Sequence, residues 1–373
     1  MSAVSERAWL VLAGARLKAA EIEALLERHG DARRLVALSD RELARAGIDD
    51  ERRRAITSPD EAALERALAW LAAPGHHLVH LYSSAYPPLL REIAGAPPVL
   101  YVRGDPGVLA LPALAIVGSR NPTRGGVRNA FEFAKHLAGA GFSISSGLAE
   151  GIDAAAHEGA LAAGGATVAW LGHGIDSTYP AANRGLAERI AAAGALASEF
   201  PLGFPPRREH FPARNRLISG SSLGTLVVEA ARRSGSLITA RLATEQGREV
   251  FAIPGSIHNA LARGCHELIR QGAKLVESAD DILGELGPLV RHLMQNTPEN
   301  SPLETPAADS RAQDADYRRL LAALAHDPMT PDEIAAHSGL TIEQVSSMLL
   351  IMELEGAVEA LHGGRYANLK ERL

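Results

Sequence analysis

The stretch GSRNPTRGG, residues 118–126, directly follows the apolar run at residues 114–117. Gly118 allows another part of the backbone to approach closely, and Ser119 with the amides after it can hold an anion. Arg120 can donate two parallel hydrogen bonds to one phosphate group. The stretch therefore predicts a phosphate-binding turn at the end of a strand.

A second turn of this kind lies in SSGLAEGIDAAAH, residues 145–157, where Gly147 and Gly151 precede a predicted helix. Backbone N–H groups at a helix N-terminus attract anions, so this turn is a candidate phosphate site. Asp153, in the first helical turn, is interpreted either as a helix cap or as a ligand contact. His157 is more typical of a packed histidine than of a catalytic base.

A third candidate turn is formed by Ser234, Gly235 and Ser236, before the predicted helix at residues 236–247. Its hydroxyl and amide groups suit a further anion site. The alternative is that Ser236 is only a helix N-cap.

Aromatic and basic residues occur together in HFPARNRLISG, residues 210–220. Phe211 beside Arg214 and Arg216 suits a stacked nucleobase next to phosphates. The alternative is that Phe211 anchors a loop through burial, and Asn215 then braces that loop instead of touching a ligand.

Motifs of several enzyme classes are absent from the sequence. There is no GxxxxGK[ST], no GxGxxG after the first strand of the sheet, no GxSxG and no HExxH, and the 14 histidines are scattered. The sequence offers several phosphate-holding groups but no convincing nucleophile with a base. We therefore expect a binding protein with no catalytic residue, no metal site and no cofactor.

The composition narrows the class further. The 373 residues, 46% of them hydrophobic, are enough for two or three domains with buried cores. The single cysteine, Cys265, excludes a disulfide framework and a cysteine-based zinc site. No signal peptide and no apolar stretch of about 18 residues is found, so we expect a cytoplasmic protein without a membrane span.

The organisation along the chain predicts four parts. Residues 1–73 show helical periodicity, typical of a sterile-alpha-motif-like or helix-hairpin-helix-like module or of a plain helical packing domain. In residues 74–286, short apolar runs alternate with helical stretches, which predicts an α/β fold with a doubly wound parallel sheet. Residues 287–315 suit a flexible linker, and three helices with a hairpin in 316–373 suit a winged helix.

The predicted topology brings the candidate turns together. The carboxyl ends of parallel strands lie at one edge of a sheet, where ligands bind. The region 74–290 contains 19 Lys/Arg and 18 Asp/Glu, whereas the whole chain has a net charge of −6. Several of these arginines follow strands, so we expect them to line that edge.

The winged-helix region is less suited to DNA. Its expected recognition helix begins near Thr341 and contains no Lys or Arg, and residues 316–373 hold nine acids against five bases. Because a helix that meets phosphates should be basic, a protein-contact or regulatory role is favoured.

Taken in order, six segments closely resemble the DNA-processing protein A (DprA/Smf) family. They are IVGSRNPTRGG, SGLAEGIDAAAH, GHGIDSTYPAANRGL, SEFPLGFPPRREHFPARNRLISGSS, VVEAARRSGSLITARLATEQGREVFAIPGS and LIRQGAKLV. The resemblance implies an extended Rossmann core that binds single-stranded DNA without sequence preference. It also implies homodimerisation through that core and loading of the RecA recombinase during natural transformation.

In that family the phosphate pocket uses the GSR and FPxRNR motifs. The resemblance implies that the matching residues here contact DNA, with Phe211 placed to meet a base: Ser119, Arg120, Arg214, Asn215 and Arg216. One departure is Ala213 inside FPxRNR, since a lysine often contributes to the family's DNA-binding surface. Arginines such as Arg207, Arg208 or Arg241 would then have to supply the charge.

Two other functions remain as alternatives. SSLGTLVVEA, residues 221–230, loosely resembles the PGGxGTxxE element of nucleotide phosphoribohydrolases. Gly224, Thr225 and Glu229 match that element, but its PGG does not. The third possibility, a transcription regulator acting through the winged helix, is disfavoured by the acidic recognition helix.

Overall fold

The computed structural model describes residues 3–295 and parts of the chain beyond them. The latter are residues 319–320, 322–324, 328–342, 345, 348–349, 352, 358–361 and 365–368. The chain forms two compact units, Met1–His292 and Leu293–Leu373.

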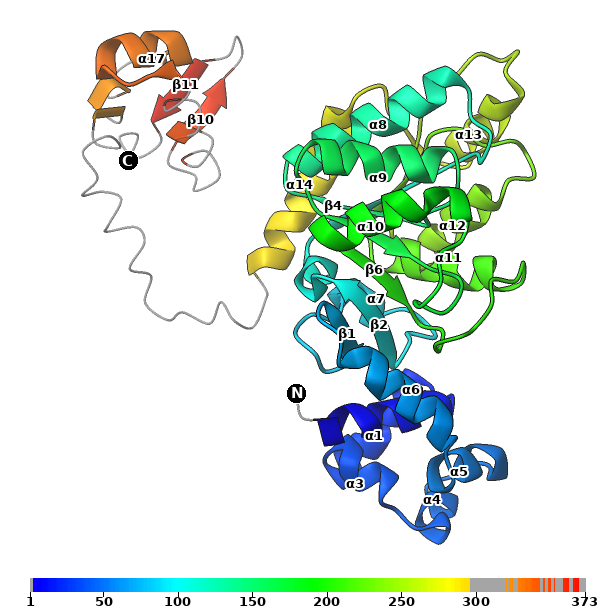
Figure 1. Ribbon diagram of the computed structural model, residues 1–373. Helices are drawn as coiled ribbons and strands as arrows, with labels where there is room; N and C mark the ends of the chain where they lie inside the picture. The colour runs from blue at the N-terminus through cyan, green and yellow to red at the C-terminus, as the bar shows by residue number, and fades with distance from the viewer. Residues whose placement is uncertain are drawn as a thin grey trace. The chain divides into compact units, whose positions relative to one another are not determined.

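The N-terminal module is helical, as predicted (Figure 1). Its helices are α1 (Ala3–Gly14), α2 (Ala19–His29), α3 (Ala32–Val36), α4 (Asp40–Arg45), α5 (Asp50–Thr57) and α6 (Glu61–Leu71). Ser39 and Glu42 form a capping box at α4, in which each side chain bonds to the backbone N–H of the other. Apolar side chains of the module share one core cluster with strand residues such as Leu78 and Tyr101, so the module is packed onto the α/β core.

A nine-stranded sheet forms that core. Its strands are β1 (His76–His80), β2 (Val99–Gly104), β3 (Ala113–Val117), β4 (Ser143–Ser146), β5 (Thr167–Trp170), β6 (Ala195–Ser198), β7 (Gly224–Val227), β8 (Glu249–Ala252) and β9 (Lys274–Leu275). The order is β1-β2-β6-β5-β4-β3-β7-β8-β9. All strands from β6 to β9 in this order pair in parallel, whereas β2 is antiparallel to both of its neighbours.

The sheet is thus mostly parallel, as predicted, with antiparallel pairing at the edge formed by β1 and β2. A parallel pair needs a crossover connection, usually a full helix. Between β1 and β2 the chain forms only the four-residue helix α7 (Pro88–Arg91), and the two strands run antiparallel.

Helices cover both faces of the sheet (Figure 1). One face packs against α8 (Arg124–Gly139), α9 (Ile152–Ala162), α10 (Arg184–Ala193) and α14 (Ala279–Gln295). The other face packs against α7, α11 (His210–Gly220), α12 (Gly235–Glu245) and α13 (Arg263–Arg270). The central strands are buried along their whole length, which confirms the doubly wound architecture.

Two local predictions are corrected. The alternative that placed Phe211 and Asn215 in a loop is wrong, because residues 210–220 form helix α11, with Pro212 in the first turn, where proline is tolerated. Helix α14 continues to Gln295 and so crosses residue 287, the predicted start of the linker. The remainder of the predicted linker, residues 296–315, lies outside the described residues.

The described parts of the C-terminal unit agree with the predicted order of elements. Helix α17 spans Pro331–Ser338 and is capped by Thr330, while β10 (Val358–Leu361) pairs antiparallel with β11 (Arg365–Asn368). The predicted turn at residues 363–364 lies outside the described residues.

Candidate nucleic-acid interface

The GSR turn lies where β3 ends, beside the end of its parallel neighbour β7. A Cβ at Gly118 would lie 2.7 Å from a side-chain carbon of Ile152, so only glycine fits this close approach. Ser119 accepts a hydrogen bond at its Oγ from the Asn121 amide (3.1 Å), which stabilises the turn. Arg120 is exposed at its tip.

Glu229, at the end of β7, holds the GSR segment in place. Its two carboxylate oxygens accept bonds from the backbone N–H (2.8 Å) and the hydroxyl (2.7 Å) of Thr123, the N-cap of α8. A Cβ at Gly126 would lie 2.6 Å from this carboxyl group. Glu229 matched the phosphoribohydrolase element in sequence, but here both of its oxygens are used to join two strand-end segments.

The turn around Gly147 is built around a buried guanidinium. The Nη1 atom of Arg214, which is 4% exposed, donates to the carbonyl oxygens of Gly147 (2.6 Å) and Trp170. A Cβ at Gly147 would lie 2.5 Å from that nitrogen. Burial lowers the pKa of Arg214 to about 10, although Asp153 acts in the opposite direction.

Asp153 completes this buried unit. It accepts hydrogen bonds from the amides of Gly147 (3.1 Å) and Ala149 (3.4 Å). Burial raises the pKa of the Asp153 carboxyl, and Arg214 opposes that shift. Asp153 is therefore not a side-chain cap of α9, whose N-cap is Gly151; its carboxyl instead holds the amides of the turn that precedes the helix.

The ring of Phe211 lies between the GSR turn and the buried Arg214, and it contacts a guanidinium from each. The guanidinium of Arg120 lies over its ring at 5.5 Å from the centroid, and that of Arg214 lies at 5.8 Å. Tyr179 lies 5.8 Å away at an interplanar angle of 34° and is 46% exposed. Tyr179 is not among the residues predicted from the sequence, where its only signal is a Tyr-Pro pair in the loop after β5. An aromatic surface with an exposed guanidinium above it suits a base stacked beside a phosphate.

The other two residues of the FPxRNR motif have different contacts. The Oδ1 atom of Asn215 accepts a bond from the Nε of Arg214 (3.3 Å), which orients that guanidinium. Arg216 forms an ion pair with Glu199 (2.5 Å), whose pKa is raised by burial. The structure therefore does not place Arg216 with Arg120 and Phe211, in contrast to the expectation from sequence.

The third candidate turn forms the N-terminus of α12. Ser234 is the N-cap, since its Oγ accepts a bond from the Ser236 amide (3.3 Å), and the two hydroxyl oxygens are 2.7 Å apart. Ser236 is buried in the first turn, so the alternative that made Ser236 the N-cap is corrected to Ser234. Gly235 is exposed, with open space around the position of a Cβ.

Comparisons with known proteins identify the family. A family model described as DNA recombination-mediator protein A matches residues 77–287, and one for the DprA winged helix domain matches residues 304–364. The chain belongs to the DprA/Smf family. The resemblance seen in the motifs is thus confirmed, and so is the C-terminal winged helix, although the matched range begins before residue 316.

Relatives within the DprA/Smf family cover most of the chain. Protein Smf of Escherichia coli is 43% identical over 309 residues, covering 83% of this chain and 81% of that protein. DNA processing protein DprA of Streptococcus pneumoniae is 46% identical over 205 residues, covering 55% of this chain and 72% of that protein.

Two solved DprA structures share the fold. The X-ray structure of DprA from Streptococcus pneumoniae has a TM-score of 0.66 at 36% identity and covers 76% of this chain and 98% of that one. A Helicobacter pylori structure, described as giving insights into a unique single-stranded DNA binding mode, has a TM-score of 0.52 at 30% identity. It covers 57% of this chain and 96% of that one.

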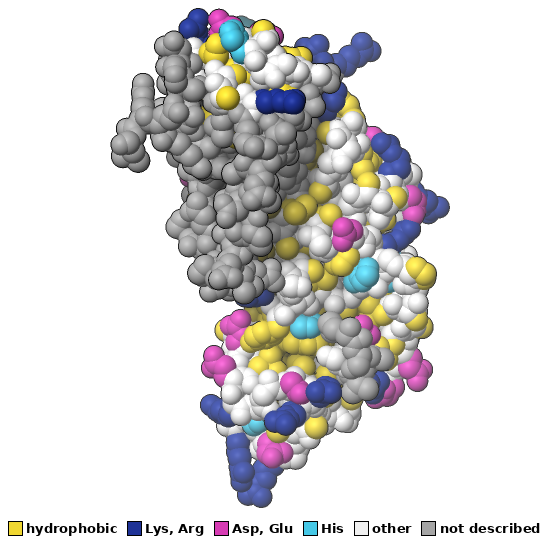
Figure 2. Space-filling model, turned by 90° about the vertical axis from the view of Figure 1, so that its left-hand side faces the viewer, with side chains coloured by type: hydrophobic (Ala, Val, Ile, Leu, Met, Phe, Trp, Pro, Cys, Tyr) yellow, Lys and Arg dark blue, Asp and Glu magenta, His cyan; other side chains and the backbone are white. Residues whose placement is uncertain are grey.

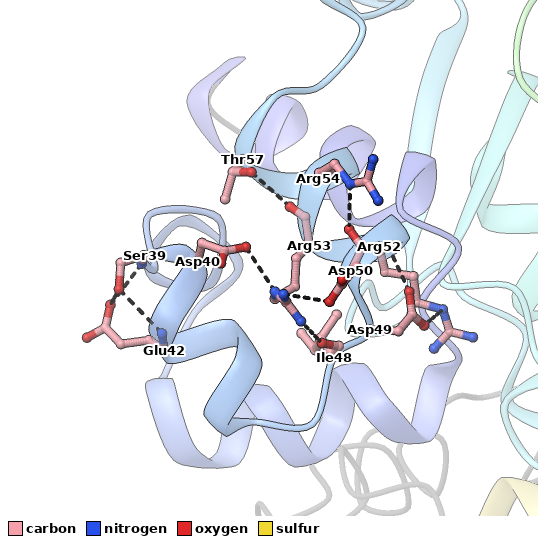
Figure 3. A network of polar contacts seen from close by, with 10 residues as sticks. All are labelled: Ser39, Asp40, Glu42, Ile48, Asp49, Asp50, Arg52, Arg53, Arg54 and Thr57. Carbon is pink, nitrogen blue, oxygen red and sulfur yellow. Dashed lines mark hydrogen bonds and ion pairs between the residues drawn. The ribbon is translucent and has the colours of Figure 1, made fainter.

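The arginine run of the N-terminal module, Arg52–Arg54, bonds to groups within the module (Figure 3). Arg53 joins α4 to α5 through Asp40 (2.9 Å), Asp50 (2.7 Å) and the carbonyl oxygen of Ile48 (2.8 Å). Figure 2 shows basic and acidic side chains interspersed over this module, at the bottom of the view. A mixed surface of this kind does not indicate a dedicated phosphate-binding face on α4 and α5.

In the part of the chain that the structure describes, no group of three or more His, Cys, Asp or Glu side chains is arranged to hold a metal ion. Over the same residues, none of the helices has the length and apolar character needed to cross a bilayer.

Proposed function

We propose that this chain binds single-stranded DNA without sequence preference at the strand-end edge of its sheet. The observation that carries the proposal is the stacking of the exposed Arg120 guanidinium over Phe211 at 5.5 Å, next to Tyr179. Aromatic faces accept any base, and guanidinium groups neutralise phosphates, so the combination favours a strand without reading its sequence.

In this proposal the site residues divide into two groups. Arg120 and Phe211 contact the strand, and the exposed Gly235 marks a second position where α12 can present its N-terminus to a phosphate. Arg214 is a positioning residue, because its buried guanidinium fixes the turn at Gly147 and supports the ring of Phe211. Ser119 stabilises the GSR turn through the Asn121 amide.

We further propose that the bound strand is passed in the cytoplasm to the RecA recombinase, and that the protein acts as a homodimer. Membership of a recombination-mediator family supports the first point. For the second, the sheet ends at the short strand β9, where Leu275 is 49% exposed. An edge strand with an exposed apolar side chain suits pairing with a second copy. Leu275→Glu should then give a monomer in light scattering.

Fluorescence anisotropy with labelled oligo-dT tests DNA binding. Phe211→Ala should weaken binding by roughly 10-fold or more, since one base–aromatic stack contributes about 1–3 kcal/mol. Arg120→Ala should weaken it by a similar factor, because it removes the cation proposed to neutralise a phosphate. Arg41→Ala, which removes an exposed charge from α4, is the matched control and should bind as wild type. Unchanged binding by folded Arg120→Ala protein would show that the strand does not use this edge.

Transfer to RecA needs its own assay. The wild-type protein should shorten the lag of RecA assembly on a strand already coated with single-strand-binding protein, and Arg120→Ala should not. If wild-type protein binds the strand but leaves the lag unchanged, the chain binds DNA without loading RecA.

A further inference from the structure

A large cavity lies between the N-terminal module and the α/β core. Its volume is about 820 Å³, and the core contributes Phe200, Phe204 and Arg216 to its lining. The module contributes residues from α1, α6 and the connection after α1, including Arg16 and Arg66. The cavity therefore has one wall from each part of the first unit.

Helix α11 separates this cavity from the strand-end site. Phe211 and Arg214 are three residues apart, so they share the face of α11 that lies against Arg120, Gly147 and Trp170. Ala213 and Arg216 are also three residues apart, and both line the cavity. Because a helix turns by about 100° per residue, the two pairs lie on opposite faces of α11.

Aromatic side chains connect the two sites around the start of α11. His210 directly precedes Phe211, and its ring centroid lies 4.6 Å from that of Phe204. Phe204 is stacked on Phe200 at 4.9 Å with an interplanar angle of 11°, and both rings are half-buried in the cavity wall. Phe211 in turn lies beside Tyr179, so two groups of aromatic rings meet at the start of α11, where His210 and Phe211 are consecutive residues.

The cavity has an excess of basic groups. Its acidic lining residues are engaged within the protein: Asp60 caps α6 through the Ala63 amide (3.0 Å), and Glu199 pairs with Arg216. Three exposed basic side chains lie around its module side: Arg16, Lys18 and Arg66. Apolar, aromatic walls beside exposed cations complement the bases and phosphates of a single strand.

We infer that this cavity is a second subsite for single-stranded DNA. A strand that crosses Phe211 continues over His210 and Phe204 into the cavity, where the N-terminal module contacts its phosphates. The inference rests on the proposed function and extends it, because it makes the helical module part of the DNA-binding site. A strand long enough to reach the cavity then binds more tightly than one that fills only the Phe211 site.

Oligonucleotides of two lengths test this with the full chain. One oligo-dT of about 6 nucleotides fills the Phe211 site, and one of about 20 reaches the cavity. The variant is Arg16→Ala with Arg66→Ala. The matched control is Arg41→Ala with Arg45→Ala, which removes two exposed charges from α4, outside the cavity.

The variant should lower affinity for the long strand by on the order of 10-fold and leave the short strand unaffected. Its plot of log affinity against log salt should be shallower by about 1.4 for the long strand, at about 0.7 per lost phosphate contact. Phe204→Ala should weaken long-strand binding in the same selective way.

Three results would overturn the inference. Equal binding of both lengths by wild type, an equal loss for both strands in the variant, or the same loss in the α4 control would each exclude a cavity subsite while leaving the Phe211 site in place. Absence of any binding by wild type would remove the proposed function and this inference together.

Discussion

The guanidinium of Arg214 fills the space that a side chain at Gly147 would need, at the carboxyl end of β4. The guanidinium donates to the carbonyl oxygen of residue 147 at 2.6 Å, and a Cβ on that residue would lie 2.5 Å from the donating nitrogen. The amide of Gly147 meanwhile donates to Asp153 (3.1 Å). One glycine thus bonds through its carbonyl oxygen to a buried guanidinium and through its amide to a buried carboxylate.

Replacing this glycine should displace the guanidinium. We expect Gly147→Ala to lower the free energy of unfolding by about 2–4 kcal/mol, because the added methyl group overpacks the site and breaks hydrogen bonds to a buried charge. Urea unfolding measures this. Gly139→Ala is the control: its Cβ would meet nothing within 4 Å in α8, so it should be neutral or slightly stabilising. Equal stability of the two variants would mean that Arg214 has room to move.

Replacing Asp153 by asparagine should destabilise the turn around Arg214. We expect Asp153→Asn to cost about 1–3 kcal/mol, since it removes the carboxylate that accepts from the Gly147 and Ala149 amides and that favours the charged form of Arg214. Asp60→Asn is the control, because asparagine caps helices as well as aspartate does, and that site is an N-cap. If Asp153→Asn unfolds at the same urea concentration as wild type, the carboxyl is already neutral in the native protein.

Much of the core could be predicted because its strands are buried on both faces. The short apolar runs of residues 74–286 form the strands of the sheet, and the turns after them lie at strand ends as expected. The antiparallel direction of β2 could not be predicted from its apolar run, because such a run does not specify the direction of a strand. The Pro-rich segment between β1 and β2, with its single short helix, was the available signal.

The FPxRNR segment shows what a motif alone cannot provide. Arg214 and Arg216 are equivalent as letters, but in a helix they point to different sides, one into the strand-end site and the other toward Glu199. The helix was missed because its first half has no apolar periodicity and is held by tertiary contacts instead. Tyr179 could not be predicted from the sequence either, because only the fold brings it next to Phe211.

The buried His157 should make the protein less stable in acid. Thr167 donates its hydroxyl to the Ile144 carbonyl oxygen (2.7 Å) and so accepts from Nδ1 of His157 (2.7 Å), which leaves the buried Nε2 without a partner. Burial lowers the pKa of His157 to about 3, against about 6.5 in an unfolded chain. Between these values the unfolded state binds one more proton than the native state.

Stability from this group is therefore present above about pH 6.5 and is lost as the pH falls toward 3. The loss should be about 1.4 kcal/mol per pH unit for the one histidine. Urea unfolding at several pH values from about 7 to 5 should show a shallower pH dependence in His157→Gln than in wild type. Parallel curves would mean that His157 takes up its proton in the native protein. His80, whose pKa burial lowers to about 4, contributes equally to both curves.

Arg53 should act as the brace of the α4–α5 hairpin. It bonds to Asp40 in α4, to Asp50 in α5 and to the Ile48 carbonyl oxygen between them, so its loss leaves two short helices held mainly by apolar contacts. We expect Arg53→Ala to speed hydrogen exchange at the amides of α4 and α5 and to leave exchange in the sheet unchanged. Arg54→Ala is the control, because its side chain bonds only to the carbonyl oxygen of Asp50 in its own helix (3.2 Å).

Arg53→Ala also tests whether Arg53 contacts DNA or only joins α4 to α5. Because the bonding groups of Arg53 are used within the module, Arg53→Ala should leave binding of a short oligo-dT, which fills only the Phe211 site, at the wild-type level. Weakened short-strand binding with unchanged exchange in α4 and α5 would instead place the arginine run on the DNA. Exchange that spreads from α4 and α5 into β1 and β2 would show that the module and the core unfold as one cooperative unit, as their shared apolar cluster allows.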